Sequence, residues 1–255
     1  MQLNTAFMWT TFLDVLHGIP TTLKLTLVTL LLSAPIGFFM ALSKSAGRGI
    51  ARKIVTVYVS FIRGTPVVLQ ILFLYSLLPT TLNYLIRNVL GLSFNIFRTD
   101  PIIYAYIVFT LNTTAVLSEV FRSALSTVPD GQLEAALSIG LNARQAYVRI
   151  IIPQALIAAL PNLCNATVSL LKSTSLAFMM TVKDITAIAK IDASFGYDYL
   201  EAYLVIFFIY ILLCSLVQFI FYLLEHTLSS YKNTTHQRQT KNGVSAFRRY
   251  PVSAR

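Results

Sequence analysis

The chain has 255 residues, of which 56% are hydrophobic and only 12% are charged. Soluble domains carry about 25% charged residues, so this composition, with a mean hydropathy of +0.68, excludes an ordinary soluble protein and predicts an all-α transmembrane protein. The net charge of +10 does not indicate a nucleic-acid partner, because the basic residues cluster in short segments that flank apolar runs.

The first 20 residues form a lead-in to the first long apolar run. Apolar and polar side chains alternate at roughly helical spacing from Phe7 to Ile19. This pattern fits either a short helix lying in the outer membrane interface or an ordinary lead-in turn. The pattern of a cleaved signal peptide, a basic start followed by a short apolar core and a small-residue site, is not evident.

Five runs are long and apolar enough to cross a bilayer, which takes about 20 residues per helix. They predict a bundle of five transmembrane helices over residues 21–228. The predicted spans are 21–43, 54–78, 102–118, 152–171 and 199–224.

The second run carries a charge well inside it, at Arg63, followed at once by Gly64 and Pro66. A charge at such depth is costly, and proline lacks the N–H that a continuous helix needs. The three residues therefore mark a structural break or a gate. An interfacial piece ending near Arg63, followed by a tilted span from Pro66, is the alternative to one long helix. Arg63 then either extends to the lipid head groups or contacts a substrate.

The basic residues indicate the orientation. They follow the first, third and fifth runs, so by the positive-inside rule those segments face the cytoplasm. The N-terminus then lies outside and the C-terminus inside. The 172–198 segment lies outside or folds back in part into the bundle. The tail, residues 229–255, is polar and basic, and we expect it to be disordered and attracted only to anionic lipid.

Polar residues inside the third and fourth runs are candidates for a translocation path. In the fourth run they share one helical face, and such a stripe must pair with another helix or meet water. Lys172, its only cation, either holds a substrate carboxylate or pairs with an outer acid such as Asp184. Glu119 and Arg122 are spaced as a helix ion pair. The path candidates are Asn112, Thr113, Asn162, Asn165, Ser169 and Lys172. Cys164 and Cys214 lie in apolar runs and predict neither a disulfide nor a metal site.

The segment 127–151, between the third and fourth runs, predicts two short helices that meet at a sharp turn. Thr127 or Asp130 caps the first helix, and Gly140 ends it in the left-handed conformation. Asn142 and Gln145 have the spacing of a capping box, which starts the second helix. Leu133, Ala136 and Leu137 form the apolar face of the first helix. These two capped helices together predict a rigid helical projection over residues 127–151.

The spacing of this segment resembles the EAA loop of ATP-binding-cassette importer permeases. It reads Glu134, Ala135, Ala136, then Gly140, Ile150 and Ile152-Pro153, with Ile152 where the pattern usually has leucine. Arg63-Gly64-Thr65-Pro66 with Gln70, and the Lys172–Leu176 run, are similar to the polar amino-acid branch of that family. The resemblance covers roughly residues 12–225. One departure is Val116, which stands where a relative usually has an aromatic residue before Glu119.

The resemblance implies the membrane-spanning permease subunit of an ATP-driven importer in the bacterial cytoplasmic (inner) membrane. It also implies that Glu134, Ala135, Ala136 and Gly140 couple the chain to a separate ATPase subunit, that an identical or related permease completes a dimer, and that an extracytoplasmic binding protein delivers a small polar amino acid. The stretch from Phe195 to Tyr203 looks most like cystine permeases, with glutamine, histidine and arginine importers left open.

Two other classes of function compete with this one. An ion-gradient-driven secondary transporter or channel is the alternative, but no acid lies central in any predicted span and no internal repeat is visible. An enzyme is not expected, because no His-Glu-x-x-His or Gly-x-Ser-x-Gly pattern occurs and the histidines lie outside the span centres. The chain lacks a phosphate-binding Gly-x-x-x-x-Gly-Lys loop, so we expect it to bind no cofactor, with ATP used by the partner subunit.

Overall fold

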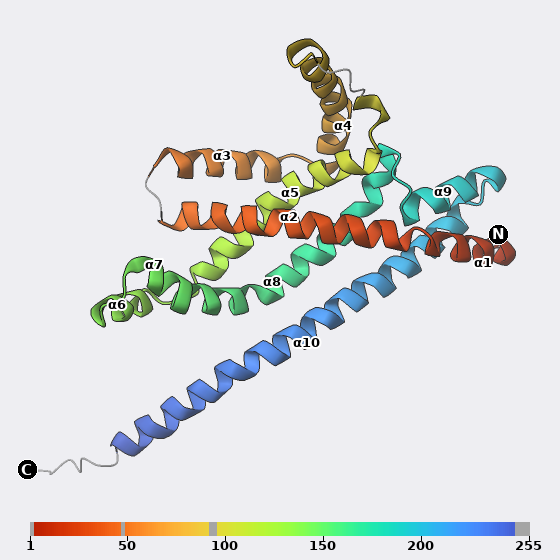
Figure 1. The fold of residues 1–255 in the computed structure, drawn as a ribbon. Helices are drawn as coiled ribbons and strands as arrows, with labels where there is room; N and C mark the ends of the chain where they lie inside the picture. Colours follow the sequence, from red (N-terminus) through yellow and green to blue (C-terminus); the bar gives the residue numbers. More distant parts are fainter. Residues whose placement is uncertain (1–2, 47–48, 92–95, 248–255) are drawn as a thin grey trace, which may run out of the picture.

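A computed structural model describes residues 3–46, 49–91 and 96–247 (Figure 1). The elements in chain order are α1 (Thr5–Leu16), α2 (Ile19–Ala46), α3 (Ile50–Gly64), α4 (Val67–Tyr84), a π-helical turn (Leu85–Val89), a 3-10 turn (Ile96–Arg98), α5 (Pro101–Leu125), α6 (Asp130–Ser138), α7 (Ala143–Ala146), a second π-helical turn (Tyr147–Ile151), α8 (Ile152–Ser173), a second 3-10 turn (Thr174–Met180), α9 (Ile185–Gly196) and α10 (Tyr199–Phe247).

Five helical stretches within the described residues are long and apolar enough to cross a membrane, which confirms the predicted number of spans. Their bounds are Ile19–Ser45, Val67–Val89, Pro101–Leu125, Ala143–Met180 and Tyr199–Leu228. The fourth stretch is much longer than predicted, because α7 and a π-helical turn lead into α8 without a break and a 3-10 turn prolongs it.

The second predicted span, 54–78, is wrong as a single helix. Thr65 and Pro66 are extended, with φ/ψ of −115°/141° and −62°/133°, so α3 ends at Gly64 and α4 starts at Val67. Proline has no N–H to continue the helix and disfavours helical geometry in the residue before it. The alternative of two pieces, with the span starting after Pro66, describes the chain correctly.

Helix α5 is the centre of the bundle and packs against α2, α3, α4 and α8 (Figure 1). Its first half, with Val108 and Phe109, shares one buried apolar cluster with α2, α4 and the 174–180 turn. Its second half, with Leu117 and Phe121, shares another cluster with α2 and α8. The helix therefore joins the two ends of the protein mechanically. Gly37 of α2 allows this close packing, since a Cβ there would lie 3.1 Å from Leu117 Cβ and from Ser118 N.

The 172–198 segment folds back against the bundle in part. The 174–180 turn buries Ala177 and Met180 among α2, α4 and α5. Helix α9 then packs against α1 and α10 and buries Ile185 and Ala189. The predicted helix in the lead-in is α1, whose Trp9 is exposed. Its position in the outer interface stays a prediction.

The expectation of a disordered tail is wrong over residues 229–247. Helix α10 runs without interruption from Tyr199 to Phe247 and extends well beyond the other helices (Figure 1). The membrane span has already met the nucleation cost of the helix, and adding residues to an existing helix is far easier than starting one. The sequence 229–247 contains no proline to stop it. Residues 248–255, the rest of the predicted tail, lie outside the described residues.

Asp184 begins α9 from a fully buried position. Its Oδ1 accepts a hydrogen bond from Ala187 N at 2.8 Å, which caps the helix, while Oδ2 has no partner among the described residues. Burial raises the pKa of this carboxyl from 3.8 to about 6, against the smaller lowering effect of backbone hydrogen bonds. The folded protein therefore binds a proton more tightly than the unfolded chain does.

We expect Asp184 to make the protein less stable as the pH rises from about 4 to about 6, by roughly 3 kcal/mol when titration is complete. Above the folded pKa the buried group must carry its charge. Asp184→Asn keeps the cap and removes the titration, so the stability difference between variant and wild type should grow with pH. Thermal unfolding of the purified protein between pH 4.5 and 7.5 measures it.

Asp100→Asn is the matched control, because Asp100 also caps a helix, through Ile102 N at 2.9 Å, but is exposed. A pH-independent difference between Asp184→Asn and wild type would contradict the prediction.

Candidate functional site

The segment between α5 and α8 forms the expected projection at one end of the bundle, called here the loop end (Figure 1). Gly140 ends α6 with φ +87°, in the left-handed region. Gly140 N donates to Leu137 O at 3.0 Å and Leu141 N donates to Ala136 O at 3.2 Å. These two bonds satisfy the last carbonyls of the helix. A Cβ at Gly140 would meet open space, so backbone conformation alone selects glycine there.

The second helix starts with the predicted capping box. Gln145 N donates to Asn142 Oδ1 at 2.9 Å, and Asn142 N donates to Gln145 Oε1 at 3.0 Å. The helix then continues through Tyr147–Ile151 into α8, so the turn and the fourth span form one continuous helical rod.

The predicted cap of the first helix is wrong. Neither candidate side chain bonds the start of α6: Thr127 Oγ1 donates to Ala124 O at 2.7 Å, and Asp130 is already the first helical residue. The preceding residue, Pro129, caps the helix without any side-chain hydrogen bond.

Helix α6 has one face on the bundle and one face free. Ala136 is buried and Leu133 packs beside the end of α5. Leu137, predicted on the packing face, is instead 46% exposed, and Ile139 is 77% exposed. Glu134, Ala135 and Gly140 are exposed as well. An exposed apolar surface next to an acidic side chain, on a rigid projection, is typical of a protein-interaction surface.

The break between α3 and α4 is stabilised by Gln70, a residue to which the sequence analysis assigned no role. Gln70 is only 8% exposed. Its Nε2 donates to Ile62 O at 2.7 Å, to Thr65 O at 3.1 Å and to Thr65 Oγ1 at 2.7 Å. Two of the carbonyl groups at the break are therefore satisfied by one amide. The available signal was a lone amide four residues after Pro66 in an apolar run.

Gln70 also fixes the break to the central helix, because its Oε1 accepts a hydrogen bond from Asn112 Nδ2 at 2.9 Å. Thr113, the next path candidate on α5, is buried. Arg63 and Gly64 are both exposed on the last turn of α3. The structure thus brings Asn112 to the break, whereas its role in a path stays a prediction.

The polar stripe of α8 lies on the outside of the chain. Asn162, Asn165, Ser169 and Lys172 are all exposed. Among the described residues, no hydrogen bond joins any of these side chains to another helix. Because such groups in a span must avoid hydrocarbon, they require water or another subunit.

Lys172 does not pair with Asp184 in this structure, where the two ion pairs among the described residues involve neither. It instead lines a groove of about 570 Å³ between α8, α9 and α10, with Ser175, Tyr203 and Tyr210. Cys164 and Cys214 are free thiols.

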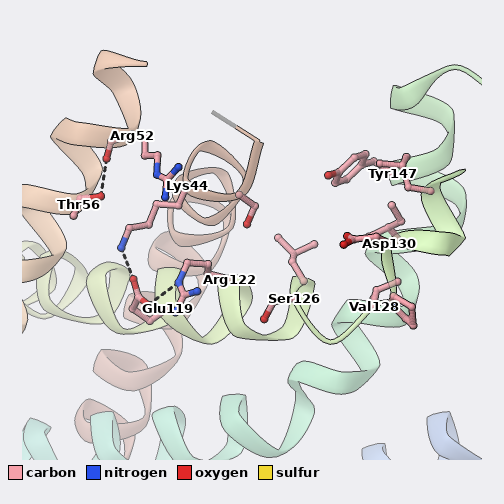
Figure 2. A pocket seen from close by; sticks show the side chains of 14 residues that line it. Lys44, Arg52, Thr56, Glu119, Arg122, Ser126, Val128, Asp130 and Tyr147 are labelled. Atoms are coloured by element: carbon pink, nitrogen blue, oxygen red, sulfur yellow. Dashed lines mark hydrogen bonds and ion pairs between the residues drawn. The ribbon is translucent and has the colours of Figure 1, made fainter. Parts of the chain in front are cut away.

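A charged cavity of about 570 Å³ lies at the loop end, between α2, α3, α5 and the start of α6 (Figure 2). Arg122 Nε donates to Glu119 Oε2 at 2.8 Å, which confirms the predicted pair. Lys44 Nζ, from the end of α2, donates to the other oxygen, Glu119 Oε1, and this third member was missed from the sequence. One carboxylate therefore binds α2 to α5 beside the projection.

Comparison with known families gives a match over residues 33–230 to the family described as binding-protein-dependent transport system inner membrane component. The chain is 32% identical over 217 residues to the L-cystine transport system permease protein TcyL of Bacillus subtilis (strain 168), covering 85% of this chain and 87% of that protein. It is 33% identical over 231 residues to the octopine transport system permease protein OccM of Rhizobium radiobacter, covering 89% of this chain and 91% of that protein.

Among solved structures, one of an amino acid ABC transporter with histidines is similar with a TM-score of 0.74 and 28% identity, over 89% of this chain and all of that one. A chain of the inward-facing MetNI methionine ABC transporter is similar with a TM-score of 0.61 and 16% identity, over 89% and 99% of the two chains. The second likeness concerns the fold alone.

We expect Gln70→Leu to destabilise the protein by at least about 2 kcal/mol, because it leaves buried carbonyls and the Asn112 amide without a partner. Thermal unfolding of the purified protein measures this. The control, Gln154→Leu, removes only an exposed bond to Ile150 O at 2.8 Å. The double variant with Asn112→Leu should lose less than the sum of the single losses. Equal losses in the two single glutamine variants would contradict the role given to Gln70.

Proposed function

The chain belongs to the family of binding-protein-dependent transport system inner membrane components, and on that premise we propose that it translocates a small polar amino acid inward at the expense of ATP hydrolysed by a separate subunit. As a member of this family it is a multi-pass permease subunit of an ABC transporter in the bacterial inner membrane. An ion-gradient-driven transporter, the alternative from composition, is not favoured.

The observation that carries the proposal is the projection at the loop end. Its α6 is anchored by Ala136 and Leu133 on one side and leaves Glu134, Leu137 and Ile139 free on the other. We propose that this free face of α6 binds in a groove on an ATPase subunit. The chain has no phosphate-binding loop of its own, so ATP acts through this contact and we assign no cofactor to the chain itself.

The proposed mechanism is alternating access. When the ATPase subunits close, they displace α6, and the capping box at Asn142 and Gln145 passes this movement to the continuous rod of α7 and α8. A nucleotide shifts such an equilibrium only by its different affinity for the two states. The contact with α6 must therefore differ between them, while the rigid end at Gly140 keeps the helix from simply unwinding.

The substrate path is proposed to run along the exposed stripe of α8. The stripe offers two amides, a hydroxyl and one cation, at Asn162, Asn165, Ser169 and Lys172. This set suits an amino acid with a polar side chain and a carboxylate. Cystine is our specific proposal, supported by the similarity to the Bacillus L-cystine permease TcyL.

Two further partners complete the proposed machine. A second permease, identical or related, faces the stripe across the path. An extracytoplasmic binding protein delivers the substrate to the end opposite the loop end. The loop end faces the cytoplasm in this proposal, because the basic segments that follow the first and third spans both lie there.

Co-purification tests the assembly directly. The chain is isolated from its native membrane in mild detergent, and bound polypeptides are identified by mass spectrometry. Recovery of an ATPase, with or without a second permease, supports the proposal and shows whether the dimer has identical subunits. Absence of an ATPase from protein that remains folded by sizing and thermal unfolding would return the ion-gradient alternative to consideration.

We expect Gly140→Pro and Glu134→Lys each to lower uptake of the radiolabelled amino acid at least tenfold while the protein stays in the membrane. Proline cannot adopt φ +87° and lacks the N–H donated to Leu137 O. The lysine reverses the charge on the free face of α6.

The matched controls are Ser138→Ala, which loses only a local bond to Glu134 O, and Glu225→Lys, an equal charge reversal on exposed α10. Both should transport close to wild type. Near-normal uptake by Gly140→Pro and Glu134→Lys, at equal membrane levels, would exclude the coupling role of the projection.

A further inference from the structure

Three hollows follow one another along α3, starting from the charged cavity at the loop end. The first, of about 570 Å³, includes Arg52 and Thr56 in its wall (Figure 2). The second, of about 770 Å³, shares Arg52 and Thr56 with the first. The third, of about 450 Å³, shares Lys53 and Val57 with the second. Since neighbouring hollows share lining residues, they adjoin one another in a row along α3, which we call the α3 track.

The chemistry of the α3 track changes from charged to apolar along its length. Three cations, Lys44, Arg52 and Arg122, line the first hollow. The third hollow is almost entirely apolar, with Ile54, Val57 and Phe61 in its wall. These three side chains are 63%, 69% and 65% exposed, and their spacing of i, i+3 and i+7 places them on one face of the helix. The track is thus amphiphilic.

The charges at the polar end leave a net positive site. Glu119 is already held by Lys44 and Arg122. Asp130, the second acid, lies on the opposite wall with Tyr147, facing the cations across the cavity (Figure 2). Arg52, and Lys53 in the second hollow, form no ion pair with any described residue. Four cations therefore stand against two acids along the first two hollows.

From this arrangement we propose that the α3 track binds a phospholipid with an anionic head group. The phosphate lies against Arg52 between the other two cations, hydroxyls of the head group donate to Asp130, and an acyl chain follows Val57 and Phe61. Basic pockets beside membrane helices bind anionic head groups in this way. The track connects α3 with Pro129 and Asp130 at the start of α6.

The apolar half of the track selects a lipid over other anions. Free phosphate has no apolar part that could contact Ile54, Val57 and Phe61. Zwitterionic phosphatidylethanolamine matches the net charge less well, because it brings a cation to a site that already has an excess of them. A second copy of the chain would cover the apolar face but would leave the charged cavity without an anion. These occupants are separable by experiment.

The test uses the full transporter complex, purified in mild detergent and exchanged into vesicles of equal parts phosphatidylglycerol and phosphatidylethanolamine. After re-extraction, lipids retained per complex are counted by native mass spectrometry. Phosphatidylglycerol should be enriched over its share of the bilayer. Arg52→Gln should lower its retention about fivefold, which corresponds to ~1 kcal/mol, and Val57→Asn should lower it as well.

The matched controls are Arg144→Gln and Val148→Asn, which change exposed residues of the same types outside the track. Both should retain the lipid as wild type does. Size-exclusion chromatography of each complex shows whether the variants remain assembled. Lipid retention is measured without any transport assay, so the outcome for the lipid site does not depend on the proposed function.

Four results would overturn the proposal. The first is that the wild type retains the two lipids in the proportion of the bilayer, and the second is that variants and controls lose lipid equally. The third is that millimolar inorganic phosphate displaces the lipid while Val57→Asn has no effect. The fourth is that Val57→Asn changes the number of permease subunits in the complex. The third result would indicate a simple anion site, and the fourth would assign the apolar face to a subunit interface.

Discussion

The structure depends on one constraint: backbone polar groups at a break in a membrane helix must find partners inside the protein, because hydrocarbon offers none. At the break between Thr65 and Pro66, the side chain of Gln70 supplies such a partner. Its amide donates to the carbonyl of Ile62, in α3, and to the carbonyl of Thr65, the residue that follows α3. Asn112 then ties this amide to α5. A local interruption in one span is thereby fixed to the centre of the bundle, and the position of α4 follows from it.

Helix α5 carries that constraint to the other end of the molecule. Its first half packs with α4 and the 174–180 turn, and its second half packs with α2, α8 and the side of α6 that bears Leu133. At the loop end, Glu119 holds Lys44 and Arg122 together. A displacement of α6 would therefore act on a helix that also supports the break, through Asn112 near its middle. In the proposed coupling, the movement would pass through packed and hydrogen-bonded contacts between these described helices.

Most features set by local sequence agree with the prediction, the cap of α6 being an exception, whereas features set by distant partners do not follow from the sequence. The capping box at Asn142 and the left-handed Gly140 depend on neighbouring residues, and both are present. The five spans follow from apolar length alone. In contrast, the role of Gln70 depends on Asn112, 42 positions away, and Lys44 meets Glu119 across 75 positions. The tail was misjudged because composition indicates disorder, whereas an existing helix propagates through it.

The stripe on α8 is exposed along the whole length of its four polar residues. Two amides and a lysine on the surface of a span are too costly to face lipid. The helices of this chain offer them no partners among the described residues, and the buried residues of α8 belong to apolar clusters formed with α2, α5, α9 and α10. The stripe must then face a second surface that also tolerates water or supplies hydrogen bonds. In the proposed assembly a second permease would supply that surface, and movement of the α7–α8 rods would open and close a polar route between two such stripes.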